Sequence, residues 1–378
     1  MPDVLIIADT IRSPDLRHAV PVAIGDPFIY AEHDGRMLVA VASFEREKVE
    51  ALGLGHEVLP LEALGLDELH ARGLKKELLR NELMLNACRR FGIESAVVPR
   101  TFPLGHADHL RAGGIELIVD QDFFDARRRS KNAAELAGIR RAQRAAEAGL
   151  SAGLDLLRRA ERSNGGLAVD GELLTCELVK LAVERAFGEH GATAEELIVS
   201  HGAQTAVGHD MGSGPIAPNE PVLFDLFPRD RESGCYADMT RTFVLGDPSD
   251  EIREYHRLSR EALALATDAV RPGVDGKEVH RLVCDFFHEH GQPTQLHKAA
   301  GVVLEDGMYH ATGHGVGLDV HEEPGLGRIG GELVAGDVIA LEPALYRHGY
   351  GGVRLEDLVL VTEDGCEVLT DFPYDLEP

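Results

Sequence analysis

The chain has 378 residues, 44% of them hydrophobic, so it is long enough to form about two domains with buried cores. Its 64 acidic residues outnumber the 38 basic ones, which gives a formal net charge of −26 at pH 7. Nucleic acids and anionic membrane surfaces attract the opposite charge, so we expect neither as a partner. Most of the excess is typical of a well-solvated surface, and part of it could serve as ligands for cations.

The five cysteines are dispersed along the chain and form no CxxC pair. An odd number of scattered thiols is typical of a reducing compartment rather than of a disulfide framework. The first residues lack the basic stretch of a secretory signal, and no apolar run approaches the ~18 residues of a membrane span. We therefore expect a cytoplasmic protein.

The first part of the chain alternates short apolar runs with helical stretches. Period-two and β-branched runs predict strands over residues 3–9, 27–35, 36–43, 94–99 and 115–120. Helical spacing predicts helices over residues 44–53, 74–92 and 105–114, two of them ending at glycine. The alternation favours an α/β domain over residues 1–125.

The next stretch, residues 121–163, is rich in Ala, Leu and Arg and predicts one long helix, with the domain boundary near residues 121–130. A second amphipathic helix is expected over residues 170–191, with Asp170 as its N-cap. Beyond it, helices are expected at about 249–270 and 275–290. Strand-like runs occupy residues 195–200, 221–227, 235–246, 337–346 and 351–361. We therefore expect an α+β second domain over residues 126–378, with largely antiparallel strands.

Two stretches of the second domain share a layout in which an apolar strand ends in an acid and a later strand carries another. The acids are Asp225 and Asp238 in one stretch and Glu342 and Glu356 in the other, spaced 13 and 14 residues apart. The similarity suggests a duplicated hairpin. An ionised carboxylate in a core is very costly without a partner, so each acid needs a cation or a salt bridge.

For any single acid, a salt bridge to nearby Arg241 or Arg354, or exposure at a strand edge, is the simpler explanation. Four acids in two matching stretches favour a metal site instead, since two divalent cations balance their charge. Together with an imidazole, these oxygen donors suit Mn²⁺, with Co²⁺ or Zn²⁺ as alternatives. Two such ions can lower the pKa of a water molecule and supply a nucleophile near neutral pH.

The stretch YHATGHGVGLDVHEEP concentrates three histidines, His310, His314 and His321, among glycines. Glycines at alternate positions disfavour a helix and let another backbone or a substrate approach closely. On a strand, His310 and His314 would share a face, and a turn would bring His321 round. We expect one of the three to bind metal and the others to donate hydrogen bonds or transfer protons, although each alone could be a surface residue.

Taken in order, VLFDLF, YADMTRTF, GHGVGLDVHEEP, ALEPALY and GGVRLEDLVLVTEDG resemble the pita-bread metallopeptidases. This family includes Xaa-Pro dipeptidase (prolidase), Xaa-Pro aminopeptidase, methionine aminopeptidase and the non-metal creatinase. The motifs span about residues 200–365, and the N-terminal part resembles the creatinase-type N-domain. The resemblance implies a pita-bread catalytic domain over residues 126–378, preceded by a creatinase-like domain over residues 1–125.

The resemblance also implies two divalent metal ions per chain, because each of the family's five ligands has a counterpart. The counterparts are Asp225, Asp238, His314, Glu342 and Glu356, with Asp238 and Glu356 bridging the two ions. Creatinase-type members have lost such ligands, and none is lost here.

Further site residues follow from the same resemblance. His209 and His321 match two substrate histidines that stabilise the tetrahedral intermediate, and Glu342 would accept the proton of the water. His310 matches a histidine near the metal, and Arg354 matches the arginine before the last ligand. The chain departs from the family at residues 226–228, Leu-Phe-Pro, and at HGAQ upstream of His209, which affects the shape of the pocket.

The implied reaction is hydrolysis of Xaa-Pro bonds in small peptides with proline second, by a dipeptidase or, for longer peptides, by an Xaa-Pro aminopeptidase. A dipeptidase needs a cation for the proline carboxylate, and Arg328 is a candidate, although an exposed loop arginine is the simpler interpretation. Methionine aminopeptidases usually lack the N-domain. A non-catalytic binding module on the same fold is the alternative from another class. The family usually forms homodimers, which implies a homodimer here.

Overall fold

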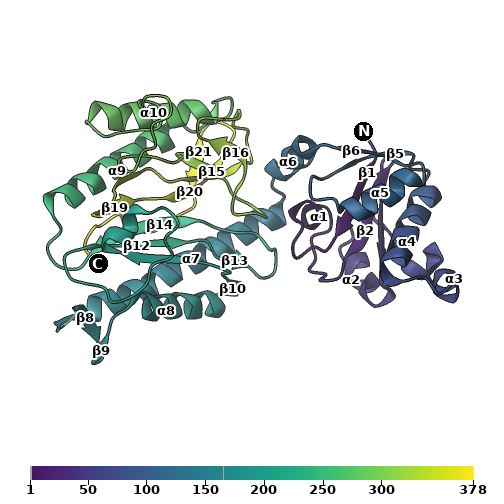
Figure 1. Ribbon diagram of the computed structural model, residues 1–378, viewed down its shortest axis with the longest axis horizontal. Helices are drawn as coiled ribbons and strands as arrows, with labels where there is room; N and C mark the ends of the chain where they lie inside the picture. The colour runs from purple at the N-terminus through teal and green to yellow at the C-terminus, as the bar shows by residue number, and fades with distance from the viewer. Residues whose placement is uncertain (1, 165) are drawn as a thin grey trace. The chain divides into compact units, whose positions relative to one another are not determined.

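The computed structural model of the chain describes residues 2–164 and 166–378 (Figure 1). Its internal contacts define two compact units, which meet in sequence between Arg128 and Arg129.

The N-terminal unit is built on one six-stranded sheet with the strand order β4-β3-β2-β1-β5-β6. Its strands are β1 (Val4–Ala8), β2 (Phe28–His33), β3 (Arg36–Val41), β4 (Glu57–Pro60), β5 (Ser95–Val98) and β6 (Glu116–Val119). Its helices are α1 (Pro14–Ala19), α2 (Arg46–Glu50), α3 (Leu66–Ala71), α4 (Lys76–Phe91), α5 (Leu104–Ala112) and α6 (Gln121–Arg129). Strands β1, β2 and β3 are antiparallel neighbours. Strand β4 pairs in parallel with β3, β5 with β1, and β6 with β5.

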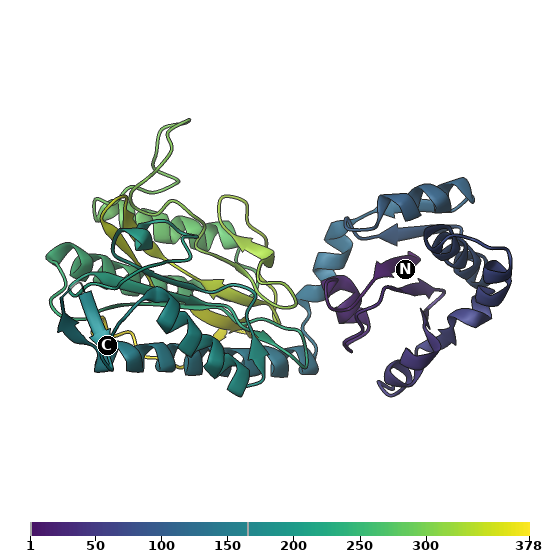
Figure 2. The ribbon, with the colours of Figure 1, turned by 60° about the horizontal axis from the view of Figure 1, so that its bottom comes forward.

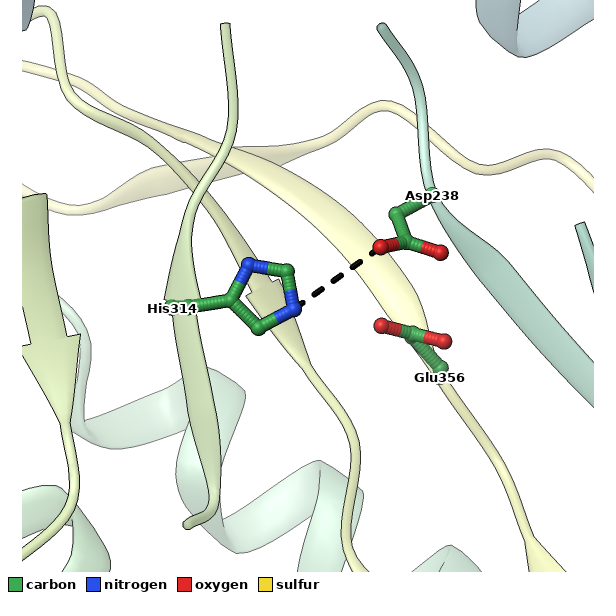
Figure 3. A group of neighbouring side chains, drawn as sticks. All are labelled: Asp238, His314 and Glu356. Carbon is green, nitrogen blue, oxygen red and sulfur yellow. Dashed lines mark ion pairs between the residues drawn. The ribbon is translucent and has the colours of Figure 1, made fainter. Parts of the chain in front are cut away.

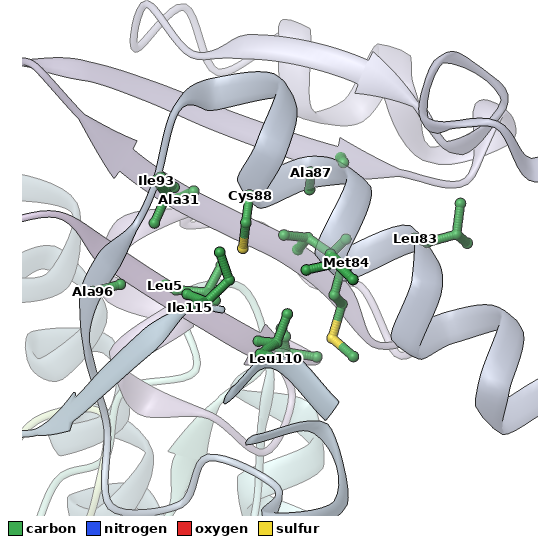
Figure 4. Packing of buried hydrophobic residues seen from close by; sticks show 14 of the residues in the cluster. Leu5, Ala31, Leu83, Met84, Ala87, Cys88, Ile93, Ala96, Leu110 and Ile115 are labelled. Atoms are coloured by element: carbon green, nitrogen blue, oxygen red, sulfur yellow. The ribbon is translucent and has the colours of Figure 1, made fainter. Parts of the chain in front are cut away.

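Both faces of the sheet are covered along its central strands β1, β2, β3 and β5, which explains their continuous apolar runs. In β1, Leu5 packs with the cluster that contains Met84 and Cys88 of α4 and Leu110 of α5 (Figure 4). The neighbouring Ile6 belongs to the cluster on the other side, with residues of α1, α2 and α6. Alternate side chains of a strand point to opposite faces, so one strand serves two cores.

The single long helix expected over residues 121–163 is wrong, because the chain breaks between α6 and α7 (Ala133–Arg159). Asn132 forms a capping box there. Its side-chain oxygen accepts hydrogen bonds from the amides of Ala134 and Glu135, each at 2.9 Å, and Glu135 accepts one from the Asn132 amide at 2.9 Å. The box satisfies amides that would otherwise lack partners, so α7 begins afresh at this point.

The expected Asp170 cap is also wrong. Asp170 has φ 53° and Gly171 has φ 87°, and together they turn the chain between β8 (Gly166–Val169) and β9 (Glu172–Leu173). An Asp-Gly pair with positive φ is the favoured turn of a β-hairpin. Helix α8 (Cys176–Glu189) begins only after Thr175, whose hydroxyl oxygen accepts a hydrogen bond from the Leu178 amide at 3.2 Å.

The C-terminal unit is α+β with antiparallel strand pairs, as expected. One sheet has the order β11-β12-β14, from Ile198–His201, Pro221–Leu226 and Met239–Val244. A second has the order β16-β15-β17-β20-β21, from Glu322–Leu326, Gly313–Gly315, Val338–Leu341, Asp357–Val361 and Cys366–Val368. The smaller strands are β7 (Glu161–Ser163), β10 (Ala192–Thr193), β13 (Arg229–Asp230), β18 (Ala344–Arg347) and β19 (Gly351–Arg354).

Two helix pairs enclose these sheets. Helices α7 and α8 lie along one side of the strands, and α9 (Asp250–Ala269) and α10 (Gly276–Glu289) lie on the other (Figures 1 and 2). Helices α7 and α8 pack on one apolar cluster, and α9 and α10 pack on another. Polar side chains of the strands between the two helix pairs therefore point away from both clusters.

All five cysteines are free thiols, and four of them are buried. Across residues 2–164 and 166–378, no helix combines the length and apolarity needed to cross a membrane.

Candidate metal centre and active site

The first acidic pair belongs to strands β12 and β14. In β12, Phe224 and Leu226 point into the core beneath α7 and α8, so Asp225 between them faces the opposite side. Asp225 lies across from Thr240 of β14, and Asp238 directly precedes that strand. Strand alternation thus turns both carboxylates away from the apolar cluster.

The second acidic pair interrupts its strands. Glu342 separates β17 from β18, and Glu356 separates β19 from β20, whereas the sequence predicts two continuous runs. Leu341 and Asp357 remain paired across the sheet. The amide of Glu356 donates to the carbonyl of Thr240 at 3.0 Å, so the backbone itself joins the second hairpin to the first.

The GHG stretch forms the short strand β15 between β16 and β17. Its glycines are required because the backbone of each neighbouring strand lies too close for a side chain. A Cβ on Gly313 would lie 1.9 Å from the carbonyl oxygen of Ala340, and one on Gly315 would lie 2.4 Å from that of Glu323. His314 projects from this strand. His310 lies before it, so the expectation that both histidines share one strand face is wrong.

The donor atoms of Asp238, His314 and Glu356 lie within 4.8 Å of one another (Figure 3). His314 Nε2 is 3.7 Å from Asp238 Oδ2 and 3.9 Å from Glu342 Oε1. Asp225 binds the guanidinium of Arg354 beside this group. All five predicted ligands therefore converge on one cavity, although they come from three separate stretches of the chain.

The chemistry of these donors fits a divalent cation. Asp238 Oδ1 is buried and has no hydrogen-bond partner among the described residues. The Nδ1 atom of His314 lies 3.1 Å from the Gly315 carbonyl, an N–H donor geometry that leaves the Nε2 lone pair free, as in metal-ligating histidines. Burial, and then the charge of Glu356, raises the pKa of Asp238 well above its usual range, and burial followed by Asp225 does the same to Glu356. A bound cation would relieve this crowding of negative charge.

Arg354 organises the polar side of the site. It is buried, donates to Asp225, and donates at 3.1 Å to both the Thr240 hydroxyl and the Tyr346 hydroxyl. Tyr346 can then donate its own proton to His310 Nε2, 3.0 Å away. That places the His310 proton on Nδ1, which lies 2.7 Å from the Ala311 carbonyl, so the chain of hydrogen bonds selects one tautomer.

The charge state of Arg354 follows from these neighbours. Burial favours the neutral guanidine, but the negative charges of Asp225, Glu342 and Glu356, together with Tyr346, raise the pKa of Arg354 well above its usual value. Arg241, the other arginine near the acids in sequence, instead pairs with Asp357 at 2.8 Å. One of the two arginine partners suggested by the sequence therefore reaches the site.

The acidic group opens into a cavity of about 1160 Å³. His209 and His321 line it and are exposed, and the rings of His314 and His321 lie 4.2 Å apart. Although His321 is partly exposed, the cavity wall shields its ring from much of the solvent. This desolvation, followed by the charges of His314 and His209, lowers the pKa of His321 to about 4, so the imidazole is neutral at pH 7. Phe227, from the Leu-Phe-Pro departure, is also part of the wall.

Four residues of the cavity wall were given no role from the sequence: Glu195, Glu196, Tyr236 and Tyr309. Tyr236 opens YADMTRTF and Tyr309 opens YHATGHGVGLDVHEEP, so their place in these motifs was the only available signal, whereas Glu195 and Glu196 stand in no motif. Arg328, the candidate for binding a proline carboxylate, is exposed and is not among the lining residues.

Buried carboxylates and an imidazole with a free lone pair, next to the neutral imidazole of His321 in an open cavity, are the donor set of a metal-dependent hydrolase. The sequence profile of metallopeptidase family M24 matches residues 137–363, more than half of the chain. The chain belongs to this family, and it is a peptidase. The predicted resemblance to pita-bread metallopeptidases is thereby confirmed.

An uncharacterized peptidase of Bacillus subtilis (strain 168) is 32% identical over 182 residues, 48% of each chain. An Xaa-Pro dipeptidase of Lactobacillus helveticus is 35% identical over 188 residues, 48% of this chain and 46% of that one. The matched segments thus span about half the length of both relatives.

Two solved structures share the whole fold. The Xaa-Pro dipeptidase from Bacillus anthracis has a TM-score of 0.79 at 23% identity and is matched over 100% of this chain and 94% of its own. The X-Pro aminopeptidase from Thermotoga maritima has a TM-score of 0.77 at 21% identity, over 100% and 97%. These likenesses confirm the α+β pita-bread fold.

Proposed function

We propose that this chain hydrolyses the bond between the first residue of a small peptide and a proline in second position, using divalent metal ions. The observation that carries the proposal is the convergence of five donor residues on one cavity. The family membership and the printed names of the similar structures support the same reaction class.

The proposed metal ligands are the five residues that the sequence singled out, Asp225, Asp238, His314, Glu342 and Glu356. Their oxygen-rich set with one imidazole favours Mn²⁺, with Co²⁺ or Zn²⁺ as alternatives. Bound ions of this kind would polarise the substrate carbonyl and lower the pKa of a water molecule.

The remaining chemistry belongs to residues of the cavity. Burial raises the pKa of Glu342, which suits a carboxylate that accepts a proton from the attacking water. His310 Nδ1 lies 3.7 Å from Glu342 Oε2, so the imidazole is next to that carboxylate, while its N–H donates to the Ala311 carbonyl. His321 is neutral, so its N–H can donate to the oxygen on which negative charge develops, and we assign His209 the same role.

Two peptide lengths remain as candidates, dipeptides and longer chains. The names of similar structures include Xaa-Pro dipeptidase, which is our first candidate. The cavity wall favours the second, Xaa-Pro aminopeptidase, because its arginine, Arg354, is already bound to Asp225, and no other arginine or lysine of the described residues lines it. A free proline carboxylate would therefore find no unpaired cation on that wall.

The test compares hydrolysis rates of Xaa-Pro and Xaa-Pro-Yaa peptides by the purified chain supplied with Mn²⁺. Faster cleavage of the dipeptide supports the dipeptidase, and faster cleavage of the tripeptide supports the aminopeptidase. Cleavage of neither, by protein that retains its metal, refutes the proposal and leaves a non-catalytic binding module as the explanation of the fold.

A further inference from the structure

We propose that Tyr309 is a positioning residue for His209, because its hydroxyl holds the loop that presents this histidine to the cavity. The inference rests on the proposed function in one respect, the assignment of His209 to substrate.

The Tyr309 hydroxyl sits between two backbone groups of the His209 loop. It donates a hydrogen bond to the carbonyl oxygen of Ala206 at 2.8 Å and accepts one from the amide of Gly208 at 2.9 Å. A Cβ on Gly208 would lie 3.6 Å from the same hydroxyl oxygen, so the phenol packs directly on this glycine. The two hydrogen bonds fix the backbone immediately before His209.

Apolar packing holds the start of this loop, where Ala206 is buried against Tyr346 and Tyr309, but contributes little to the residues that follow. Val207 is 45% exposed, Gly208 has no side chain, and His209 is exposed at the cavity. Turn hydrogen bonds from Val207 to Gln204 and from Asp210 to Val207, at 3.0 and 2.9 Å, shape the loop locally. These bonds lie within the loop, whereas the Tyr309 hydroxyl ties it to a distant part of the fold.

Tyr309 is itself held in place by contacts of its ring and of its backbone. Its ring stacks on Tyr346 with centroids 4.7 Å apart and planes at 28°, and Gln295 donates to its backbone carbonyl. Tyr346 is fully buried and accepts a hydrogen bond from Arg354. The anchor is therefore continuous with the hydrogen-bond network around the proposed metal ligands, and this continuity sets where His209 stands relative to them.

The substitution Tyr309→Phe keeps the ring and its stacking and removes only the hydroxyl. Neutral hydrogen bonds each contribute modestly to stability, so the fold should survive the loss of two of them. We expect kcat/KM to fall roughly tenfold, through kcat more than through KM, because a misplaced donor weakens contacts made in the transition state.

A double-mutant cycle identifies the route of this effect. The wild type, Tyr309→Phe, His209→Ala and the double variant are compared on one Xaa-Pro substrate with Mn²⁺. If Tyr309 acts through His209, the tyrosine substitution causes no further loss in the His209→Ala background. Tyr255→Phe is the matched control: it removes a hydroxyl bound to Glu251 at 3.0 Å, away from the cavity, and should leave both constants unchanged.

A second measurement does not depend on activity. Hydrogen exchange of the metal-free protein reports on the Gly208 amide, which should exchange faster in Tyr309→Phe and at the wild-type rate in Tyr255→Phe. The metal content and the thermal midpoint should stay those of the wild type.

Two results overturn the inference: additive losses in the cycle, or unchanged exchange at Gly208. Full activity of His209→Ala removes the assigned role of that histidine and the inference with it. A wild type that cleaves no Xaa-Pro peptide refutes the proposed function, and the exchange experiment alone then decides whether Tyr309 holds the loop.

Discussion

The stability of the catalytic unit should depend strongly on one buried ion pair, between Arg241 and Asp357. Both residues are 1% exposed, and their atoms Nη2 and Oδ1 lie 2.8 Å apart. Arg241 also donates to the backbone carbonyls of Glu356 at 2.7 Å and Pro373 at 2.9 Å. It therefore ties the C-terminal segment to the backbone of a proposed metal ligand.

Substituting Arg241→Met leaves the Asp357 carboxylate buried without its cation. Breaking such a pair costs about 3–5 kcal/mol. The Tyr374 hydroxyl still donates to Asp357, so we expect the lower part of that range, about 3–4 kcal/mol. In a unit of 150–250 residues each kcal/mol shifts the thermal midpoint by about 2–4 °C, which gives a decrease of about 6–16 °C.

The assay is thermal unfolding of the metal-free protein, followed by circular dichroism. Arg140→Met is the matched control, because Arg140 makes a two-bond pair with Glu367 at 2.9 and 2.7 Å on the surface and should cost less than about 1 kcal/mol. Adding Asp357→Asn to Arg241→Met should recover part of the loss, since no uncompensated charge remains. An Arg241→Met shift no larger than the Arg140→Met shift would refute the reasoning.

Three further results are expected. Asp238→Asn should weaken Mn²⁺ binding at least about tenfold, measured as metal retained per chain, whereas Glu184→Gln on the exposed face of α8 should not. Burial lowers the pKa of His280 from 6.5 to about 4, so the stability it supports is present above pH 6.5 and lost as the pH falls to 4. Denaturant titrations measure this decrease in the free energy of unfolding between pH 6.5 and 4, and His280→Gln should reduce the decrease by up to about 3 kcal/mol. An equally large decrease in the variant would contradict the role of His280. Gly313→Ala should abolish folded, metal-binding protein, because its Cβ would meet the Ala340 carbonyl at 1.9 Å; a soluble variant with wild-type metal content would count against this.

The local pattern of the chain predicts most strands and helices correctly, because burial on one or two faces leaves a regular trace in sequence. The errors fall where short-range chemistry competes with that pattern. Asp170 looks like a helix cap, but the following glycine makes the pair a hairpin turn, and Thr175 caps the helix instead. Asn132 divides a run of good helix formers, because its capping box favours a new start.

In the site, too, some features could be predicted from the sequence and others could not. The five donor residues could be named from the sequence, because an acid inside an apolar strand is conspicuous and because their order resembles a known family. The partner of each arginine could not be named. Arg241 and Arg354 both lie near acids in sequence, yet Arg354 binds Asp225 and Arg241 binds Asp357, more than 100 residues away in each case.

By itself the sequence predicted the candidate ligands, from acids inside apolar strands, and through its resemblance to a known family it predicted the catalytic fold and the reaction class, since both depend on patterns within short segments and on the order of motifs. Only the tertiary structure decided which tautomer His310 adopts and which arginine reaches the acids. It also decided that the Tyr309 hydroxyl forms hydrogen bonds with the loop of His209. Those features are hydrogen bonds between segments far apart in the chain. Their geometry is set by the packing of whole strands and helices, and no local pattern records it.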